Sequence, residues 1–123
     1  TEMGRKHIVP YGLYRVEGYI SPALANQEGK GTGFSEEDLE VFWQALENMF
    51  ELDHSASRGK MASRKLFIFK HDSELGNAPS HKLFDLITHE LAEDKVVPRQ
   101  FSDYKIYVDR DNLPDGVKLI ERF

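Results

Sequence analysis

The sequence contains no cysteine among its 123 residues. This absence excludes a disulfide scaffold, a thiolate zinc site and a cysteine nucleophile. No apolar run approaches the roughly 18 residues that a membrane-spanning helix needs, and no signal peptide opens the chain. We therefore expect a cytoplasmic protein with no membrane partner. The chain begins with Thr1 rather than Met, so we expect its start to be an edge or an interior point of a longer protein.

Catalytic constellations are also missing. No Ser-His-Asp or paired-carboxylate arrangement stands out, and the many acidic residues cluster on what we expect to be a solvated helix face. The glycine loop GKGTG (residues 29–33) precedes a helix N-terminus, but its spacing does not match the P-loop. Glu36, Glu37 and Asp38 would repel a phosphate there, so we interpret the segment as a flexible loop. We expect no enzyme activity and no cofactor.

Metal ligands do not form a recognisable set. No HExxH motif exists, because Glu93 stands four residues after His89. The segment DRDNLPDG begins like a calcium loop but has Pro114 at position six and Ile120 at position twelve. We interpret it as a plain turn, and we interpret the histidines as surface or hydrogen-bonded residues. The five histidines are His7, His54, His71, His81 and His89.

What is present favours one folded domain over residues 1–123. Forty per cent of the residues are apolar and 11% are aromatic, which is enough for a packed core. The clearest pattern is an apolar stripe at helical spacing over residues 36–51. Ser35 is placed to cap this helix, and Asp38 stands three residues on, as in a capping box.

The other segments predict an α+β fold. Alternation predicts strands at residues 7–21 and 101–109, a short dense apolar run predicts a strand at residues 65–71, and a further strand is expected near the C-terminus. The spacing of Leu83, Phe84, Ile87 and Leu91 predicts a second, shorter helix, with Ser80 as its possible N-cap. Helix and strand both stay open for THELAEDKVVPRQ (residues 88–100). The expected order is strand, helix, strand, helix, strand, strand. It predicts a mostly antiparallel sheet with helices on one face, a ferredoxin-like or RNA-recognition-motif-type arrangement, in whole or in part.

Positive charge is concentrated in one segment. Residues 53–71 contain five Lys or Arg and one acid, a local charge of +4, although the whole chain carries −5. Small residues surround these cations in HSASRGKMASRK, which suits contact with phosphate oxygens by charge and by short hydrogen bonds. A smaller cluster, Arg5-Lys6-His7, precedes the first predicted strand. The residues alone leave two interpretations open, a solvated loop and a phosphate contact.

Four blocks of the sequence resemble a known family. They are GRKHIVPYGLYRVEGYIS, GFSEEDLEVFWQALENMFELDHSASRGKM, LFIFKHDSELGNAPSHKLFD and FSDYKIYVDRDNLPDGV. In this order they resemble the C-terminal part of the type I-C CRISPR-associated backbone subunit, the Cas7 family. The resemblance implies a partial palm of RNA-recognition-motif type. Residues 7–71 would form its second half, and residues 72–123 would be an addition or would return to the sheet.

The resemblance also implies a function. Members polymerise along one CRISPR RNA and hold its backbone, while the exposed guide pairs with target DNA. The implied partners are therefore CRISPR RNA, target DNA through the guide, other copies of the chain and other Cascade subunits. By matching blocks, RNA contact falls on Arg5, Lys6, His7, Arg58 and Lys60. For Arg64 and Lys65 two interpretations stay open, an RNA contact of lesser weight and a role that only frames the following strand. Two other hypotheses stay open: a protein-interaction module that binds through its acidic helix, and a metal-dependent nuclease.

Overall fold

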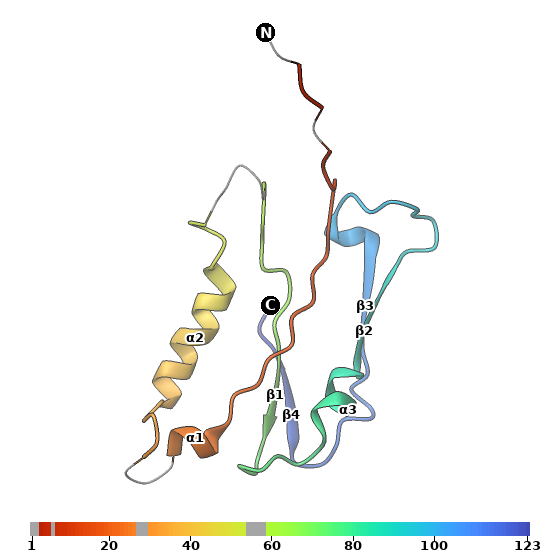
Figure 1. Ribbon diagram of the computed structural model, residues 1–123. Coiled ribbons are helices and arrows are strands. Elements are labelled where there is room, and N and C mark those ends of the chain that lie inside the picture. The colour runs from red at the N-terminus through yellow and green to blue at the C-terminus, as the bar shows by residue number, and fades with distance from the viewer. Residues whose placement is uncertain (1–2, 6, 27–29, 54–58) are drawn as a thin grey trace.

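The structure is a computed structural model, and it describes residues 3–5, 7–26, 30–53 and 59–123. Three helices, one 3-10 helix and four strands lie in these ranges (Figure 1). In chain order they are α1 Pro22–Asn26, α2 Glu36–Asn48, β1 Phe67–His71, α3 Ser80–Phe84, β2 Ile87–Leu91, η1 Phe101–Asp103, β3 Tyr104–Val108 and β4 Val117–Glu121.

The four strands pair as two antiparallel ribbons. β1 pairs with β4, and β2 pairs with β3. The predicted α+β class with antiparallel pairing is confirmed, and the arrangement is consistent with a partial ferredoxin-like palm. The prediction of one sheet is wrong for the described residues, where each ribbon has two strands. Because β4 returns to β1, the C-terminal region rejoins the strand that follows the basic segment.

Helix α2 begins where the sequence predicts. The backbone N–H of Asp38 donates to the Ser35 hydroxyl at 3.1 Å, and the Ser35 N–H donates to the Asp38 carboxylate at 2.9 Å. This reciprocal capping box uses two donors that the helix cannot satisfy by itself. The hydrogen bonds to Ser35 also hold the pKa of Asp38 below its ordinary value. The helix ends at Asn48, three residues earlier than predicted.

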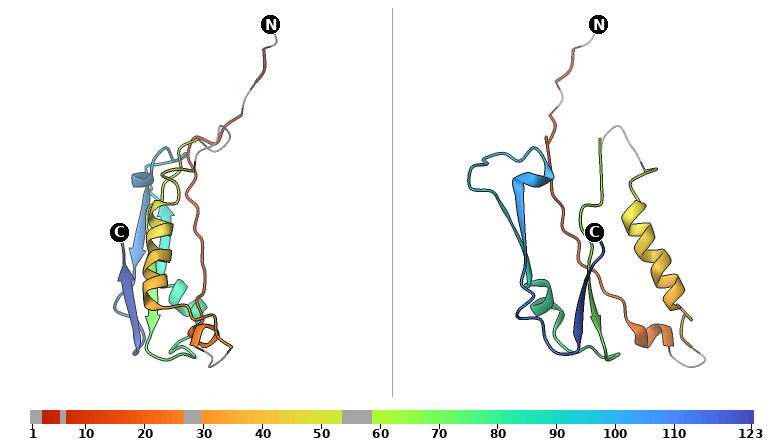
Figure 2. Two further views of the ribbon diagram at one scale, coloured as in Figure 1. Left: turned by 90° about the vertical axis from the view of Figure 1, so that its left-hand side faces the viewer. Right: turned by 180° about the vertical axis from the view of Figure 1, so that it is seen from behind.

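The predicted strand at residues 7–21 is not a strand. The chain is extended there and crosses one side of the molecule (Figure 2), but it pairs with no other strand in the described part. Side chains attach it instead. The Arg15 guanidinium donates to the carbonyl oxygens of Phe84 and Ile87, and the Tyr19 ring meets the Phe84 ring edge-on at 5.7 Å. The alternating pattern therefore reflects contacts of side chains rather than a hydrogen-bonded ladder.

The second predicted helix is shorter than its apolar spacing indicated. Helix α3 stops at Phe84, where the N–H of Asp85 donates to the carbonyl oxygens of His81 and Leu83. The next five residues form β2, which begins with the β-branched pair Ile87 and Thr88. The prediction that the helix includes Ile87 is thus wrong, and the segment from Thr88, for which helix and strand both stayed open, begins as a strand. Ser80 is also not the N-cap, since Pro79 holds that position without a side-chain hydrogen bond.

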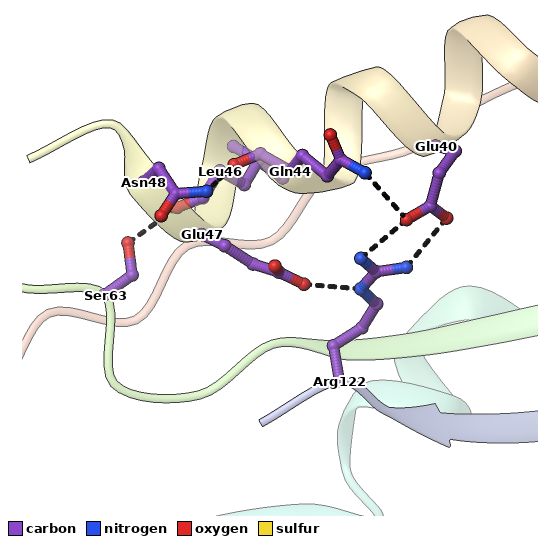
Figure 3. Close-up of polar contacts among 7 residues, drawn as sticks. All are labelled: Glu40, Gln44, Leu46, Glu47, Asn48, Ser63 and Arg122. Atoms are coloured by element: carbon purple, nitrogen blue, oxygen red, sulfur yellow. Dashed lines mark hydrogen bonds and ion pairs between the residues drawn. The ribbon is translucent and has the colours of Figure 1, made fainter.

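A fork of hydrogen bonds joins α2 to the end of β4. The guanidinium of Arg122 binds both carboxylate oxygens of Glu40 at 2.9 Å, and its Nε donates to Glu47 two turns further along the helix (Figure 3). These bonds lower the pKa of the Glu40 carboxyl and raise the pKa of Arg122. The Ser63 hydroxyl donates to the carbonyl of Leu46 at 2.7 Å, and so ties the basic segment to the same helix.

Little of the apolar surface is buried. Among the described residues only Leu83 and Val117 form a fully buried apolar core. Large apolar side chains stay exposed on α2 and on the extended segment, including Phe42 (41% exposed), Met49 (48%) and Val16 (90%). The chain exposes 10,205 Å² in total. A compact monomer of this mass exposes about 6,800 Å² by the usual scaling, so about 3,400 Å² lies uncovered.

The Arg122 fork generates the first prediction. Replacing Arg122 with Lys keeps the charge but removes the planar fork that engages both oxygens of Glu40 and reaches Glu47. We expect backbone amides of α2 to exchange with solvent several-fold faster in this variant, while those of the β2–β3 ribbon are unchanged. Hydrogen exchange followed by mass spectrometry measures both. Equal protection of α2 in the two proteins would show that the fork does not hold the helix.

Candidate nucleic-acid interface

The 3-10 helix η1 is held in place by the carboxylate of Asp103. The buried carboxylate of Asp103 accepts hydrogen bonds from the backbone N–H groups of Arg99 (2.8 Å) and Gln100 (3.2 Å). The ammonium group of Lys95 lies 3.8 Å away. Chiefly because the Arg99 N–H binds it, the pKa of Asp103 is lowered. The carbonyl of Asp103 also accepts from the N–H of Ala92, which fixes η1 to the end of β2.

Two segments far apart in the sequence contact η1 and the first residue of β3. The guanidinium of Arg64 lies over the ring of Phe101, 4.7 Å from the ring centroid. The ring of Tyr11 lies 6.3 Å from the ring of Tyr104, the first residue of β3. Arg64 is the last residue of the SRGKMASR stretch, and Tyr11 stands four residues after His7, the last residue of the GRKH stretch. Arg64 of one basic segment and Tyr11, which follows the other, therefore lie near η1 and the start of β3. The chain before Tyr11 leads away from these elements toward the N-terminus (Figure 1).

The predicted site residues differ in what the structure says of them. Arg5, His7, Lys60 and Arg64 are exposed, while Lys6 and Arg58 lie outside the described residues. Lys65, which the sequence left as a weaker candidate, is 3.0 Å from the carboxylate of Glu121 in an ion pair. Its charge is thus already balanced, unlike that of Arg64, whose one described contact is with an aromatic ring.

One basic residue near η1 escaped the sequence analysis. Arg99 directly precedes η1, and its side chain is exposed while its backbone N–H is held by Asp103. It stands two residues before Phe101, the residue whose ring Arg64 covers. Its guanidinium can therefore reach a phosphate group that Arg64 also contacts. The sequence signal was weak, because Arg99 is an isolated cation in VVPRQ. Only the fold brings it beside the basic segment.

Two backbone amides of the glycine loop are hydrogen-bonded within the fold. The N–H groups of Thr32 and Gly33 donate to the carbonyl oxygens of Leu24 and Ala25, at the end of α1. These donors would otherwise be the ones to bind a phosphate before a helix. The loop interpretation is supported, with the addition that residues 32 and 33 fold back on α1.

The histidine and aspartate motifs have structural partners. The Nδ1 atom of His71 accepts the backbone N–H of Asn77 at 2.8 Å, which closes the turn after β1. Asp109 accepts two hydrogen bonds from Asn112, and the segment that follows is a turn, as predicted. Over the described ranges, no group of three or more His, Cys, Asp or Glu residues is placed to hold a metal ion.

Comparison with known families gives an independent result. The family model of CRISPR-associated protein Cas7 matches residues 1–109 of the 123. The chain belongs to the CRISPR-associated Cas7 family. A comparison with curated proteins finds no matching sequence.

Membership of the Cas7 family supports a CRISPR-associated backbone subunit of a Cascade-type, RNA-binding ribonucleoprotein that acts in antiviral defence. Members of the family are generally non-catalytic, and CRISPR RNA and other Cascade subunits are the partners that the family suggests. No helix in the described part of the chain is long and apolar enough to cross a membrane. The match extends across both basic clusters, η1 and the first three strands.

The carboxylate of Asp103 generates the second prediction. Because its folded-state pKa lies below the ordinary value of 3.8, it stabilises the fold above that pH, and this contribution is lost as the pH falls through the lowered pKa. Replacing Asp103 with Ala should lower Tm by several degrees at neutral pH. The difference from the wild type should shrink as the pH falls below about 4.

Thermal unfolding of both proteins over a pH series measures this difference. Asp111→Ala serves as a control, since Asp111 is exposed and lies in the turn between β3 and β4. A Tm difference that stays constant down to the lowest pH would contradict an ionised role for Asp103.

Proposed function

We propose that this chain is a non-catalytic guide-RNA-binding subunit of a type I-C CRISPR surveillance complex in the cytoplasm. In this proposal several copies line one CRISPR RNA, and the guide that they hold pairs with target DNA. The observation that carries the proposal is that Arg64, at the end of one basic segment, lies over Phe101 of η1. Tyr11, four residues after His7 of the other basic segment, lies against Tyr104 directly after η1. The chain as a whole carries a net charge of −5.

The chemistry of these two segments fits phosphate rather than bases. Arg5, His7, Lys60 and Arg64 are exposed cationic or titratable groups, and the Phe101 face is already covered by Arg64. A site of this kind holds a nucleic acid by charge, whereas a base-reading site offers free aromatic faces. We therefore expect binding that does not depend on RNA sequence and that weakens steeply with salt. Base pairing by the guide would then supply the sequence specificity.

The uncovered surface supports assembly with other subunits. The chain alone exposes about 3,400 Å² more than a compact monomer of its mass, and permanent complexes bury about 2,000–5,000 Å² counted over both partners. Exposed apolar residues on α2 and on the extended segment contribute to this excess. We propose that neighbouring copies and other Cascade subunits cover this surface, so that RNA binding and subunit packing use different parts of the chain.

The proposed phosphate contacts give the third prediction. Replacing both Arg58 and Lys60 with Glu should weaken binding of single-stranded RNA about tenfold or more at low salt, because two attractive charges become repulsive. Fluorescence anisotropy with a labelled RNA measures the affinity.

A matched control keeps the net charge equal. Replacing Lys30 and Lys82 with Glu makes the same change of charge at two exposed positions, beside α1 and in α3, at the other end of the molecule (Figure 2). This control should bind RNA nearly as well as the wild type. If both double variants lose affinity equally, overall charge and not the SRGKM segment controls binding.

A second candidate function has its own observation. The apolar stripe of α2 is only partly covered, with Phe42 and Met49 exposed next to an acidic face. A protein-interaction module that binds through this helix would use the same surface without RNA. It predicts no RNA affinity and complexes that survive nuclease treatment, whereas the RNA-binding proposal predicts complexes that nuclease dissolves.

Self-association gives the fourth prediction. Replacing Phe42 and Met49 with Glu should reduce the mass of the self-associated species seen by sedimentation, because charge on the exposed stripe opposes burial. Leu75→Glu changes a residue that is 96% exposed in a turn away from α2, and should have no effect. A monomeric wild-type protein at all concentrations would contradict the proposed packing of copies through α2.

The nuclease hypothesis keeps a direct test. It requires metal-dependent cleavage of RNA or DNA by the purified chain that is lost when His71 or His89 is replaced. His71 already accepts a hydrogen bond through Nδ1, which leaves only Nε2 for a metal. We propose that neither histidine is catalytic.

A further inference from the structure

Two lysines lie opposite each other where the β1–β4 ribbon nears its turn. The register pairs Lys70 with Lys118, so both side chains leave the same face of the ribbon. The N–H of Arg122 donates to the carbonyl of Leu66, and alternation from that bond makes Lys70 and Lys118 a hydrogen-bonded pair. The Cα atoms of such a pair are about 5.5 Å apart, close enough for both ammonium groups to reach one anion.

The pair carries uncompensated charge. Like charges directly opposite each other across an antiparallel ribbon destabilise it. Over the described ranges, no ion pair or hydrogen bond of either side chain is found, whereas Lys65 and Arg110 both contact Glu121. The fold keeps two positive charges together without a protein counter-ion.

In the β2–β3 ribbon, opposite charges face each other across the strands. There Lys105 of β3 stands opposite Glu90 of β2, so each exposed charge faces one of opposite sign. Lys105, Lys70 and Lys118 thus all lie in paired strands, but Lys105 faces an acidic residue and the other two face each other. This contrast supplies a control within the same chain.

The lysine pair borders a hollow on the surface. A shallow depression of about 410 Å³ is lined by Lys70, Lys118, Ile120 and the turn residues beside them, including Asp72. The Asp72 carboxylate accepts a hydrogen bond from the Asn77 side chain, which holds it in the turn. Two ammonium groups against one carboxylate leave the depression positive, and a lysine ammonium binds phosphate as a compact point charge.

We infer that Lys70 and Lys118 bind a phosphate group of a polynucleotide backbone, separately from the basic residues near η1. The inference rests on the proposed function for its ligand but on the strand register for its site. Arg64 lies six residues before Lys70, about 20 Å away along an extended chain. The two places would therefore contact different nucleotides of one strand, or guide RNA at one place and target DNA at the other.

The test measures the salt dependence of binding. Each phosphate contact on a single strand contributes about 0.7 to the slope of log affinity against log salt. Because the pair binds one phosphate group, replacing Lys70 and Lys118 with Gln should reduce this slope by about 0.7 and weaken binding several-fold at low salt. Anisotropy with single-stranded RNA and with DNA of the same sequence distinguishes the two sources of phosphate. Loss for one polymer alone identifies the strand that the site holds.

Two control variants separate the site from charge and folding. Lys82→Gln with Lys105→Gln removes the same net charge and should leave the slope nearly unchanged. Lys70→Arg with Lys118→Arg keeps both charges and should retain most of the slope. The Gln pair should also raise Tm by a few degrees, since it removes the repulsion across the ribbon. A lost slope therefore does not come from unfolding.

A probe without nucleic acid distinguishes failure of the site from failure of the proposed function. Tripolyphosphate should raise Tm of the wild type and not of the Gln pair. That result without any RNA or DNA binding would support the anion site and overturn the RNA-binding proposal. RNA binding with an unchanged slope in the Gln pair, and no effect of tripolyphosphate, would overturn this inference alone.

Discussion

The attachment of α2 by Arg122 is the constraint on which the rest of the arrangement depends. The capping box stabilises the N-terminus of the helix, but a helix of 13 residues has only marginal stability without tertiary contacts. Its apolar stripe is only partly covered. The fork from Arg122 to Glu40 and Glu47 fixes the helix against the end of β4, and Ser63 fixes the basic segment to the helix. These contacts join α2 to the segment before β1 and to the end of β4.

The same contacts explain how an acidic protein can present exposed cations. Glu40, Glu47 and Glu121 all accept hydrogen bonds from cations, and Asp103 is bound by backbone N–H groups. These carboxylates are occupied inside the fold, so they oppose a nearby anion less than the overall charge indicates. Arg64 is held by an aromatic ring instead, and its charge stays unpaired in the described part. Fold and charge distribution are thus set by one network.

Local rules predicted the elements whose signals lie within one segment. The capping box at Ser35, the dense apolar run around Phe69 and the alternation around Ile106 need only neighbouring residues, and all three gave the right element type. The second helix failed at Ile87, because β-branched residues with a strand partner outweighed a short apolar spacing. Arg15 could not be placed from the sequence, because it donates to carbonyl groups 69 and 72 residues away. Arg99 could not be placed either, because it is an isolated cation in the sequence. The pairing of Lys70 with Lys118 likewise depends on a register that no local pattern sets.

The attachment of the extended segment has a further consequence. Among the described residues, no backbone–backbone hydrogen bond involves residues 7–21, whose fixed points are the Arg15 guanidinium and two tyrosine rings. Three side chains can release together at little cost, whereas a strand in a sheet must break a whole ladder. The backbone between the fixed points also keeps its donors and acceptors unspent. Release of these three contacts would therefore detach the extended segment and uncover the ring and the carbonyl group of Phe84. Neither ribbon would have to unfold.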